Sequence, residues 1–352
     1  MKFAATGALA AAVAGLGLMA ASDASAQEVT LKVHHFVGPK SVQQTVVIQP
    51  WADAVMRDSK GRIKVEIYPA MQLGGKPPEL YDQVKDGVVD VVWTLPGYSG
   101  NRFLLSQVFE MPFMITTAEA TTLAFQEFGE KHLAGTDFKD VKVLTYHTAA
   151  RFKIHMIDAP IVRADDFKGR KVRATSRAMG SLLSALGATP VFMPVPAVPE
   201  ALSKGVVAGA VLPWEIVTPL RVYELVNYHS LIETERGFAG AAFLYAMNKK
   251  KYESLPDDLK AVIDKNSGMT LAKRLGPEYD KVEVVGRGLA EKRGNKFNVI
   301  DPAEVAKMEK LAQPAIDKWV SDVTRKGYDG KGMLAEARAL IDKYTRQTAT
   351  KK

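Results

Sequence analysis

Short apolar runs typical of β-strands alternate along much of this chain with longer stretches of helical periodicity. Strand-like runs in the first half include Leu31–Phe36, Ile63–Tyr68 and Val89–Trp93, and Thr117–His132 predicts a helix with Thr117 as its N-cap. The same alternation begins again after about residue 150. Strand–helix–strand units imply right-handed crossovers and parallel pairing, so we expect two α/β units in series, each with a parallel sheet.

The last third of the chain has a different character. After Phe243 the sequence is mostly helical, over Leu255–Lys292 and Pro302–Tyr344, and Pro277 and Pro302 predict breaks. No flexible Gly/Ser linker separates the two α/β units. We therefore expect two lobes joined by hinge crossings and covered by a helical C-terminus.

The first 26 residues have the pattern of a secretory signal peptide. Lys2 forms a short positive region, Phe3–Ala21 is uncharged and rich in Ala, Leu, Val and Gly, and Ala24–Ala26 is a small-x-small cleavage site. We expect cleavage after Ala26 and export to the periplasm. Removal of the segment takes away one Lys and one Asp, so the formal charge of the mature chain stays +8.

The composition excludes several kinds of chemistry. The chain has no cysteine, which excludes a thiolate nucleophile, an iron–sulfur cluster or a Cys-ligated zinc. The charge of +8 is compatible with a nucleic-acid surface, but an exported chain meets no such partner. The six histidines do not show metal-ligand spacing, and no hydrolase or nucleotide-binding motif is present. We expect no enzyme, no cofactor and no metal.

Several segments, in order and spacing from about residue 30 to 345, resemble one family. These segments are Tyr68–Gly75, Leu80–Asp90, Phe167–Arg173, Gly187–Val191, Pro199–Gly209, and Met247-Asn248 with Tyr252–Pro256. Together they resemble the extracytoplasmic solute-binding proteins of TRAP transporters, the DctP-like group.

The resemblance implies a two-lobed clamshell of the periplasmic-binding-protein type. Each lobe would hold a central β-sheet flanked by helices, with hinges near Ala149 and Ala239. The expected divisions are lobe I at 27–149 plus about 239–270, lobe II at 150–238 plus about 295–330, a bridging helix at about 268–292, and a C-terminal helix and tail at 331–352.

The resemblance also implies a function. Members of the family capture a solute, usually an organic acid, and deliver it to small and large membrane subunits. We expect a monomer that performs no chemical step. One alternative is a ligand carrier for a membrane sensor, without a transport role. A second is a secreted hydrolase or lyase, but the sequence shows no nucleophile–base pair or paired carboxylates for it.

Arg173 is the main candidate for the binding site, because it matches the arginine that clamps the ligand carboxylate in the family. A guanidinium stays charged and offers parallel donors to a carboxylate, which lysine cannot do. A second cation is expected nearby. Arg151 and Lys153 both lie near the position where some relatives place it, and the spacing to Arg173 does not distinguish them. Arg151 is weakly favoured because it directly follows the predicted hinge strand.

The remaining candidates lie where predicted strands end. The family's usual polar residues are missing from Ala208–Leu212, which argues against a sugar acid. A mostly apolar pocket with one cation fits a monocarboxylate with an aromatic or short branched group, such as a mandelate-like or phenylpyruvate-like 2-hydroxy or 2-oxo acid. Glu215 could accept from a ligand hydroxyl or help to bind a cation. The other candidate wall residues are Trp214, His35, Phe36, Trp93, Tyr98 and, more weakly, Phe113.

Overall fold

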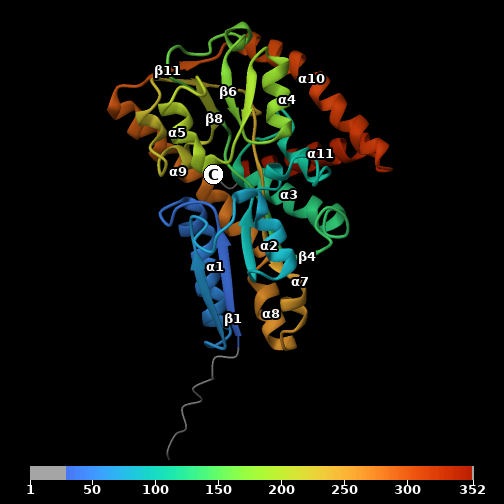
Figure 1. Ribbon diagram of the computed structural model, residues 1–352. Coiled ribbons are helices and arrows are strands. Elements are labelled where there is room, and N and C mark those ends of the chain that lie inside the picture. The colour runs from blue at the N-terminus through green and yellow to red at the C-terminus, as the bar shows by residue number, and fades with distance from the viewer. Residues whose placement is uncertain (1–28, 351–352) are drawn as a thin grey trace, which may run out of the picture.

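The computed structural model describes residues 29–350, so the expected signal peptide lies outside the described residues. These residues form two lobes, one above the other, and each lobe is built on one β-sheet (Figure 1). No helix among them is long and apolar enough to cross a bilayer. The sheet of the first lobe has the order β2-β1-β3-β10-β4, with strands β1 (Val29–His35), β2 (Ile63–Tyr68), β3 (Val91–Thr94), β4 (Val141–Thr148) and β10 (Ala242–Asn248).

The second lobe contains a sheet of six strands. Its order is β11-β9-β5-β8-β6-β7. The strands are β5 (Lys153–Met156), β6 (Lys171–Ala174), β7 (Thr189–Phe192), β8 (Gly209–Leu212), β9 (Tyr228–Leu231) and β11 (Lys296–Val299).

The prediction of parallel sheets is wrong for two strands. β1, β2 and β3 pair in parallel, as do β6, β7 and β8. β10 is antiparallel to both β3 and β4, and β5 is antiparallel to both β8 and β9. The reason is the path of the chain. β4 and β9 both end at the junction of the lobes, so the strand that follows each of them starts at the junction and runs away from it.

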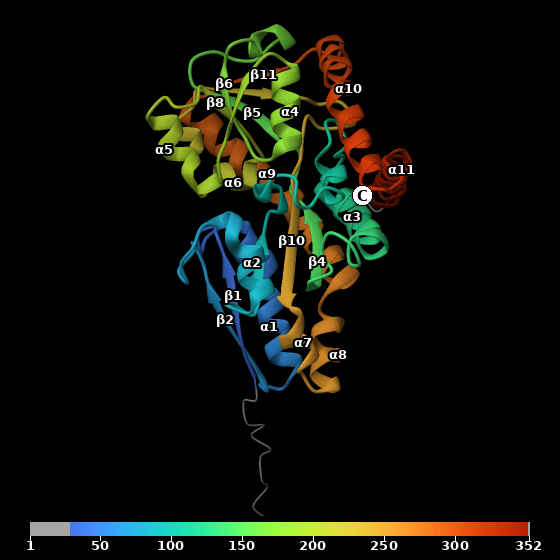
Figure 2. The same cartoon turned by 45° about the vertical axis from the view of Figure 1, so that its right-hand side comes forward.

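Helices cover both sheets (Figure 2). The predicted helix over 117–132 is observed as α3, and the Thr117 side chain caps it by accepting a hydrogen bond from the Ala120 N–H at 3.0 Å. A π-helical turn, η1 (Gln43–Ile48), leads into α1. The bounds are α1 (Gln49–Asp58), α2 (Leu80–Asp86), α3 (Ala118–His132), α4 (Arg177–Ala185), α5 (Val198–Ser203), α6 (Trp214–Val217), α7 (Lys249–Glu253) and α8 (Asp257–Lys265).

One long helix, α9 (Gly268–Arg293), connects the lobes. It packs on α3 and β4 of the first lobe and on α6 of the second. The predicted break at Pro277 is wrong, because the helix continues through this residue. An interior proline costs about 3 kcal/mol. The neighbouring turns are held by close packing on α3, where a side chain on Gly276 would come within 2.7 Å of the Glu119 Cα.

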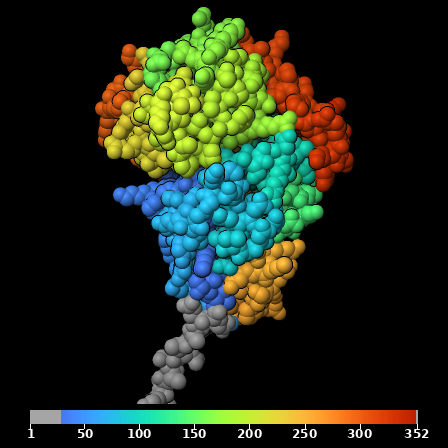
Figure 3. Space-filling model, in the orientation of Figure 1, coloured from blue at the N-terminus to red at the C-terminus, as the bar shows by residue number. Residues whose placement is uncertain are grey.

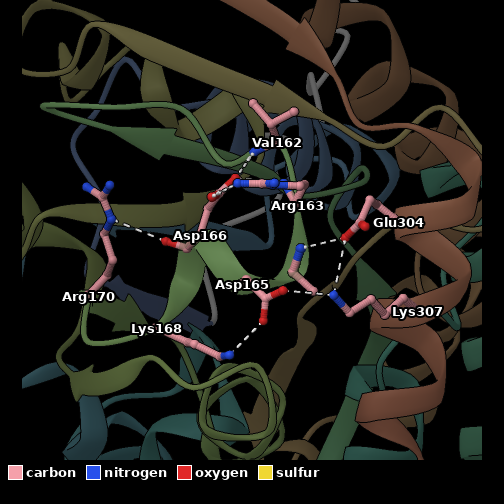
Figure 4. A network of polar contacts seen from close by, with 9 residues as sticks. Val162, Arg163, Asp165, Asp166, Lys168, Arg170, Glu304 and Lys307 are labelled. Carbon is pink, nitrogen blue, oxygen red and sulfur yellow. Dashed lines mark hydrogen bonds and ion pairs between the residues drawn. The ribbon is translucent and has the colours of Figure 1, made fainter.

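The two C-terminal helices pack on different lobes. α10 (Pro302–Arg325) begins at Pro302, as predicted, and packs on α4 of the second lobe. α11 (Gly330–Ala349) packs on α3 of the first lobe. Figure 4 shows how α10 is anchored: Glu304 accepts from the Ala164 N–H at 2.9 Å, and Lys307 pairs with Asp165 at 2.9 Å. The chain therefore passes from one lobe to the other once more near its end.

Candidate functional site

A cavity of about 320 Å³ lies between the lobes. Residues that directly follow strands on both sides line it: Phe36 after β1, Leu95 after β3, Thr175 after β6 and Pro213 after β8. Ligands of α/β proteins commonly bind at these carboxyl ends of strands. The two lobes are in contact along the junction on the face shown in Figure 3.

Arg173 supplies the positive charge of the cavity. It lies on β6 and is 1% exposed. Its Nη1 donates to Thr175 Oγ1 at 2.5 Å, and its Nε and Nη2 donate to the Met193 carbonyl at 3.2 and 3.1 Å. A guanidinium has five N–H groups. Three of them bond to Thr175 and Met193, which hold the guanidinium in place, and the hydroxyl of Tyr98 is a further hydrogen-bonding neighbour. The N–H groups that remain on the terminal nitrogens can bond to a ligand.

Residues 29–350 provide no carboxylate that neutralises this guanidinium. Among residues 29–350, no Asp or Glu forms an ion pair with Arg173. Burial lowers the pKa of Arg173, and the neighbouring Tyr98 opposes this effect. A buried charge without a partner is costly, whereas a charge-assisted pair with an anion is strong in such a place. The cavity is thus suited to an anionic ligand.

Aromatic side chains form one wall of the cavity. The ring of Trp93 stacks on Phe243 with centroids 4.8 Å apart and lies 4.9 Å from the ring of Phe36. Tyr98 continues the wall, 5.4 Å from Phe36. The Trp93 indole N–H donates to His147 Nε2 at 2.7 Å, which fixes the orientation of the indole. These rings offer flat apolar surface to a planar ligand.

Gln43 and Glu215 form a second polar group on the cavity. Gln43 Nε2 donates to Glu215 Oε1 at 3.4 Å, and both side chains are buried. Burial raises the pKa of Glu215 to about 8, so this carboxyl is largely protonated at pH 7. Among residues 29–350, no group of three or more His, Asp or Glu side chains is arranged to hold a metal ion.

The two candidates for a second cation do not line the cavity. Arg151 is at the hinge, where its guanidinium donates to the carbonyls of Thr116, Thr234 and Glu235. Lys153 forms a half-buried ion pair with Glu283 of α9. Both side chains therefore have partners within the protein, and Arg173 is the cation that faces the cavity.

Three further candidates also lie outside the cavity lining. His35 bonds through Nε2 to Gln44 Oε1 at 3.0 Å, and burial lowers its pKa to about 4. Trp214 packs against His229 with ring centroids 4.7 Å apart, inside the second lobe. Phe113 packs edge-on against Phe238. The structure therefore brings together five of the candidates from the sequence, which are Arg173, Glu215, Phe36, Trp93 and Tyr98.

Sequence reasoning missed other lining residues. Thr175 could have been found, because it lies two positions after Arg173, directly beyond the end of β6, and alternate residues of an extended chain point to the same side. Gln43 gave no such signal; it is part of the π-helical turn that leads into α1. Phe152 follows the hinge crossing near Ala149 and Phe243 lies on the returning strand β10, but neither was named as a site residue.

The fold and the site define a two-lobed solute-binding protein with a ligand cavity at the lobe junction. A model of the bacterial extracellular solute-binding proteins, family 7 (DctP), matches residues 33–322. The chain belongs to this family, the solute-binding proteins of TRAP transporters.

Solved structures of this family are close to the chain. A TRAP solute-binding protein from a marine metagenome, specific for aromatic acid ligands and solved with 3-hydroxybenzoate, is 45% identical, with a TM-score of 0.88 over 90% of this chain and 99% of that one. A TRAP solute-binding protein from Rhodoferax ferrireducens, solved with copurified benzoate, is 42% identical, with a TM-score of 0.88 over 91% and 99%. The C4-dicarboxylate-binding DctP of Rhodobacter capsulatus is 26% identical over 90% of this chain and 94% of its own length.

Proposed function

We propose that this chain is the periplasmic binding subunit of a TRAP transporter and that it captures an aromatic monocarboxylate. The observation that carries the proposal is the buried Arg173 guanidinium, which lines the cavity, has no carboxylate partner among residues 29–350 and has an aromatic wall beside it. The ligand carboxylate pairs with the guanidinium, and the ring lies along Trp93 and Phe36. The aromatic acids bound by the two relatives above support the same ligand class.

The proposed action involves no chemical step. The solute binds between the lobes, which turn about crossings near Ala149 and Ala239, and the closed form then delivers it to the membrane subunits. A ligand that contacts both lobes binds the closed form better, so it shifts the population toward that form. Small-angle scattering with and without ligand tests the closure, because an unchanged radius at saturation contradicts it.

A thermal-shift screen of carboxylic acids, followed by calorimetry, tests the ligand class. A ligand at one hundred times its Kd stabilises the native state by about 2.7 kcal/mol. Benzoates and other aromatic monocarboxylates are expected to raise Tm, and Arg173→Ala is expected to abolish the shift. Arg170→Ala is the matched control, since Arg170 lies outside the cavity and donates to the Asp166 carbonyl. Equal binding by wild type and Arg173→Ala would disprove the proposal.

A further inference from the structure

The second polar group of the cavity is made by residues from opposite lobes. Gln43 lies on η1 of the first lobe, and Glu215 lies on α6 of the second. Their exposed fractions are 1% and 3%. The bond between Gln43 Nε2 and Glu215 Oε1 uses only one atom of each side chain. The other two oxygens, Gln43 Oε1 and Glu215 Oε2, are buried and bond to no described residue.

These two oxygens differ in hydrogen-bonding character. The amide oxygen of Gln43 is an acceptor. The carboxyl of Glu215 is a donor through its O–H, because burial raises its pKa to about 8; Lys153 opposes the rise without cancelling it. The nearby Glu283 accepts the Glu215 backbone N–H at 3.2 Å and pairs with Lys153, and the hydroxyl of Tyr279 is a hydrogen-bonding neighbour of the Gln43 side chain. Both residues line the cavity, so an acceptor and a donor lie in its wall.

We propose that Gln43 and Glu215 form a subsite for a hydroxyl group on the ring of the bound aromatic carboxylate. A phenolic hydroxyl matches the pair, since it donates to Gln43 Oε1 and accepts from the Glu215 carboxyl. No hydrogen bond or ion pair joins this pair to Arg173, so the subsite recognises a different part of the ligand from the carboxylate. The inference rests on the proposed function and adds the ring substituent that the cavity selects.

The subsite also penalises ligands that lack the hydroxyl. A methyl group in its place would cover two buried polar atoms without bonding to either. Leaving such atoms unpaired disfavours binding by about ten- to a hundredfold. Because Gln43 and Glu215 come from different lobes, the hydroxyl also adds a contact that exists only when the lobes are closed.

Calorimetry with matched pairs of ligands tests the subsite. The 2-, 3- and 4-hydroxybenzoates are compared with the corresponding methylbenzoates, and the affinity ratio of each pair is measured. Wild type is expected to prefer one hydroxybenzoate isomer by tenfold or more. Gln43→Met and Glu215→Leu are each expected to bring that ratio close to one. Glu215→Gln is expected to retain the preference, because its amide still provides a donor.

Controls separate this inference from the proposed function. Gln44→Met changes a neighbouring glutamine that bonds to His35 outside the cavity, and it should keep the wild-type ratio. Arg173→Ala should bind neither the hydroxybenzoate nor the methylbenzoate of any pair. Failure of wild type to bind any benzoate would contradict the proposed function. Tight benzoate binding with ratios that are equal in wild type, Gln43→Met and Glu215→Leu would overturn the subsite alone. Circular dichroism checks that each variant folds. If Glu215→Leu does not fold, Gln43→Met alone is enough to test the subsite.

Discussion

The hydroxyl of Tyr98, in the first lobe, accepts a hydrogen bond from the backbone N–H of Val195, in the second lobe, at 2.9 Å. Tyr98 lines both the inner cavity and a second hollow of about 850 Å³ outside it. The lobes are also close beside this bond, where a side chain on Gly97 would come within 2.7 Å of the Ser176 Cβ. Tyr98 thus stands between the cavity and the outer hollow and holds the lobes together.

Tyr98→Phe is therefore expected to speed ligand release. The variant keeps the aromatic wall but leaves the Val195 N–H without its acceptor in the closed form. Loss of such a bond weakens the closed complex by about tenfold. Stopped-flow measurement of the dissociation rate checks the prediction, with Tyr146→Phe as control, since the Tyr146 hydroxyl is buried and bonds to no described residue. Equal dissociation rates for Tyr98→Phe and wild type would count against this role of the Tyr98 hydroxyl.

Arg173→Met is expected to stabilise the ligand-free protein while abolishing binding. Arg173 is buried without an acidic partner, and replacing buried charges by apolar residues of similar volume is often stabilising. The free energy of unfolding should rise by about 1 kcal/mol, because lost bonds to Met193 and Thr175 offset part of the gain. Urea unfolding checks it, with Arg170→Met as control. A marked loss of stability would show that the guanidinium is mainly structural.

Glu215 is expected to make stability depend on pH. Its pKa is raised from 4.5 to about 8 in the folded protein, so between these values the native state holds a proton that the unfolded chain has lost. This contribution to stability is complete below pH 4.5 and is lost as pH rises toward 8, at about 1.4 kcal/mol per pH unit. Urea unfolding at pH 5, 6, 7 and 8 should show that the free energy of unfolding of Glu215→Gln rises relative to that of wild type as pH rises. A constant difference would mean that the carboxyl is ionised throughout.

The ion pair of Lys153 and Glu283 is expected to affect stability most when only one of its two side chains is replaced. The two side chains are 18% and 14% exposed and join the hinge strand β5 to α9. Lys153→Met should destabilise the protein, by less than the about 3–5 kcal/mol of a fully buried pair, because Glu283 loses its cation in a half-buried place. The double variant Lys153→Met/Glu283→Met should recover most of this loss. Urea unfolding of the four proteins measures the coupling, and additive losses would contradict it.

Local patterns in the sequence were enough to predict much of the fold. The alternation of strands and helices predicted the two α/β units, Thr117 predicted the start of α3, and Pro302 predicted the start of α10. These features depend on interactions within a few residues, such as a cap or a missing N–H. The ordered segments that resemble one family led to the solute-binding class and to Arg173, which lies in the cavity.

The features that depend on contacts between distant segments were decided only by the tertiary structure. Gln43 and Glu215 are 172 positions apart and meet only because the lobes close on each other. Trp214 and Glu215 are neighbours in the chain, yet successive residues of a helix point about 100° apart, so one enters the core and the other faces the cavity. The reversed direction of β10 likewise follows from the path of the chain across the junction. Periodicity in a sequence reports which side of an element is apolar, whereas the contacts of that side depend on where the rest of the chain is packed.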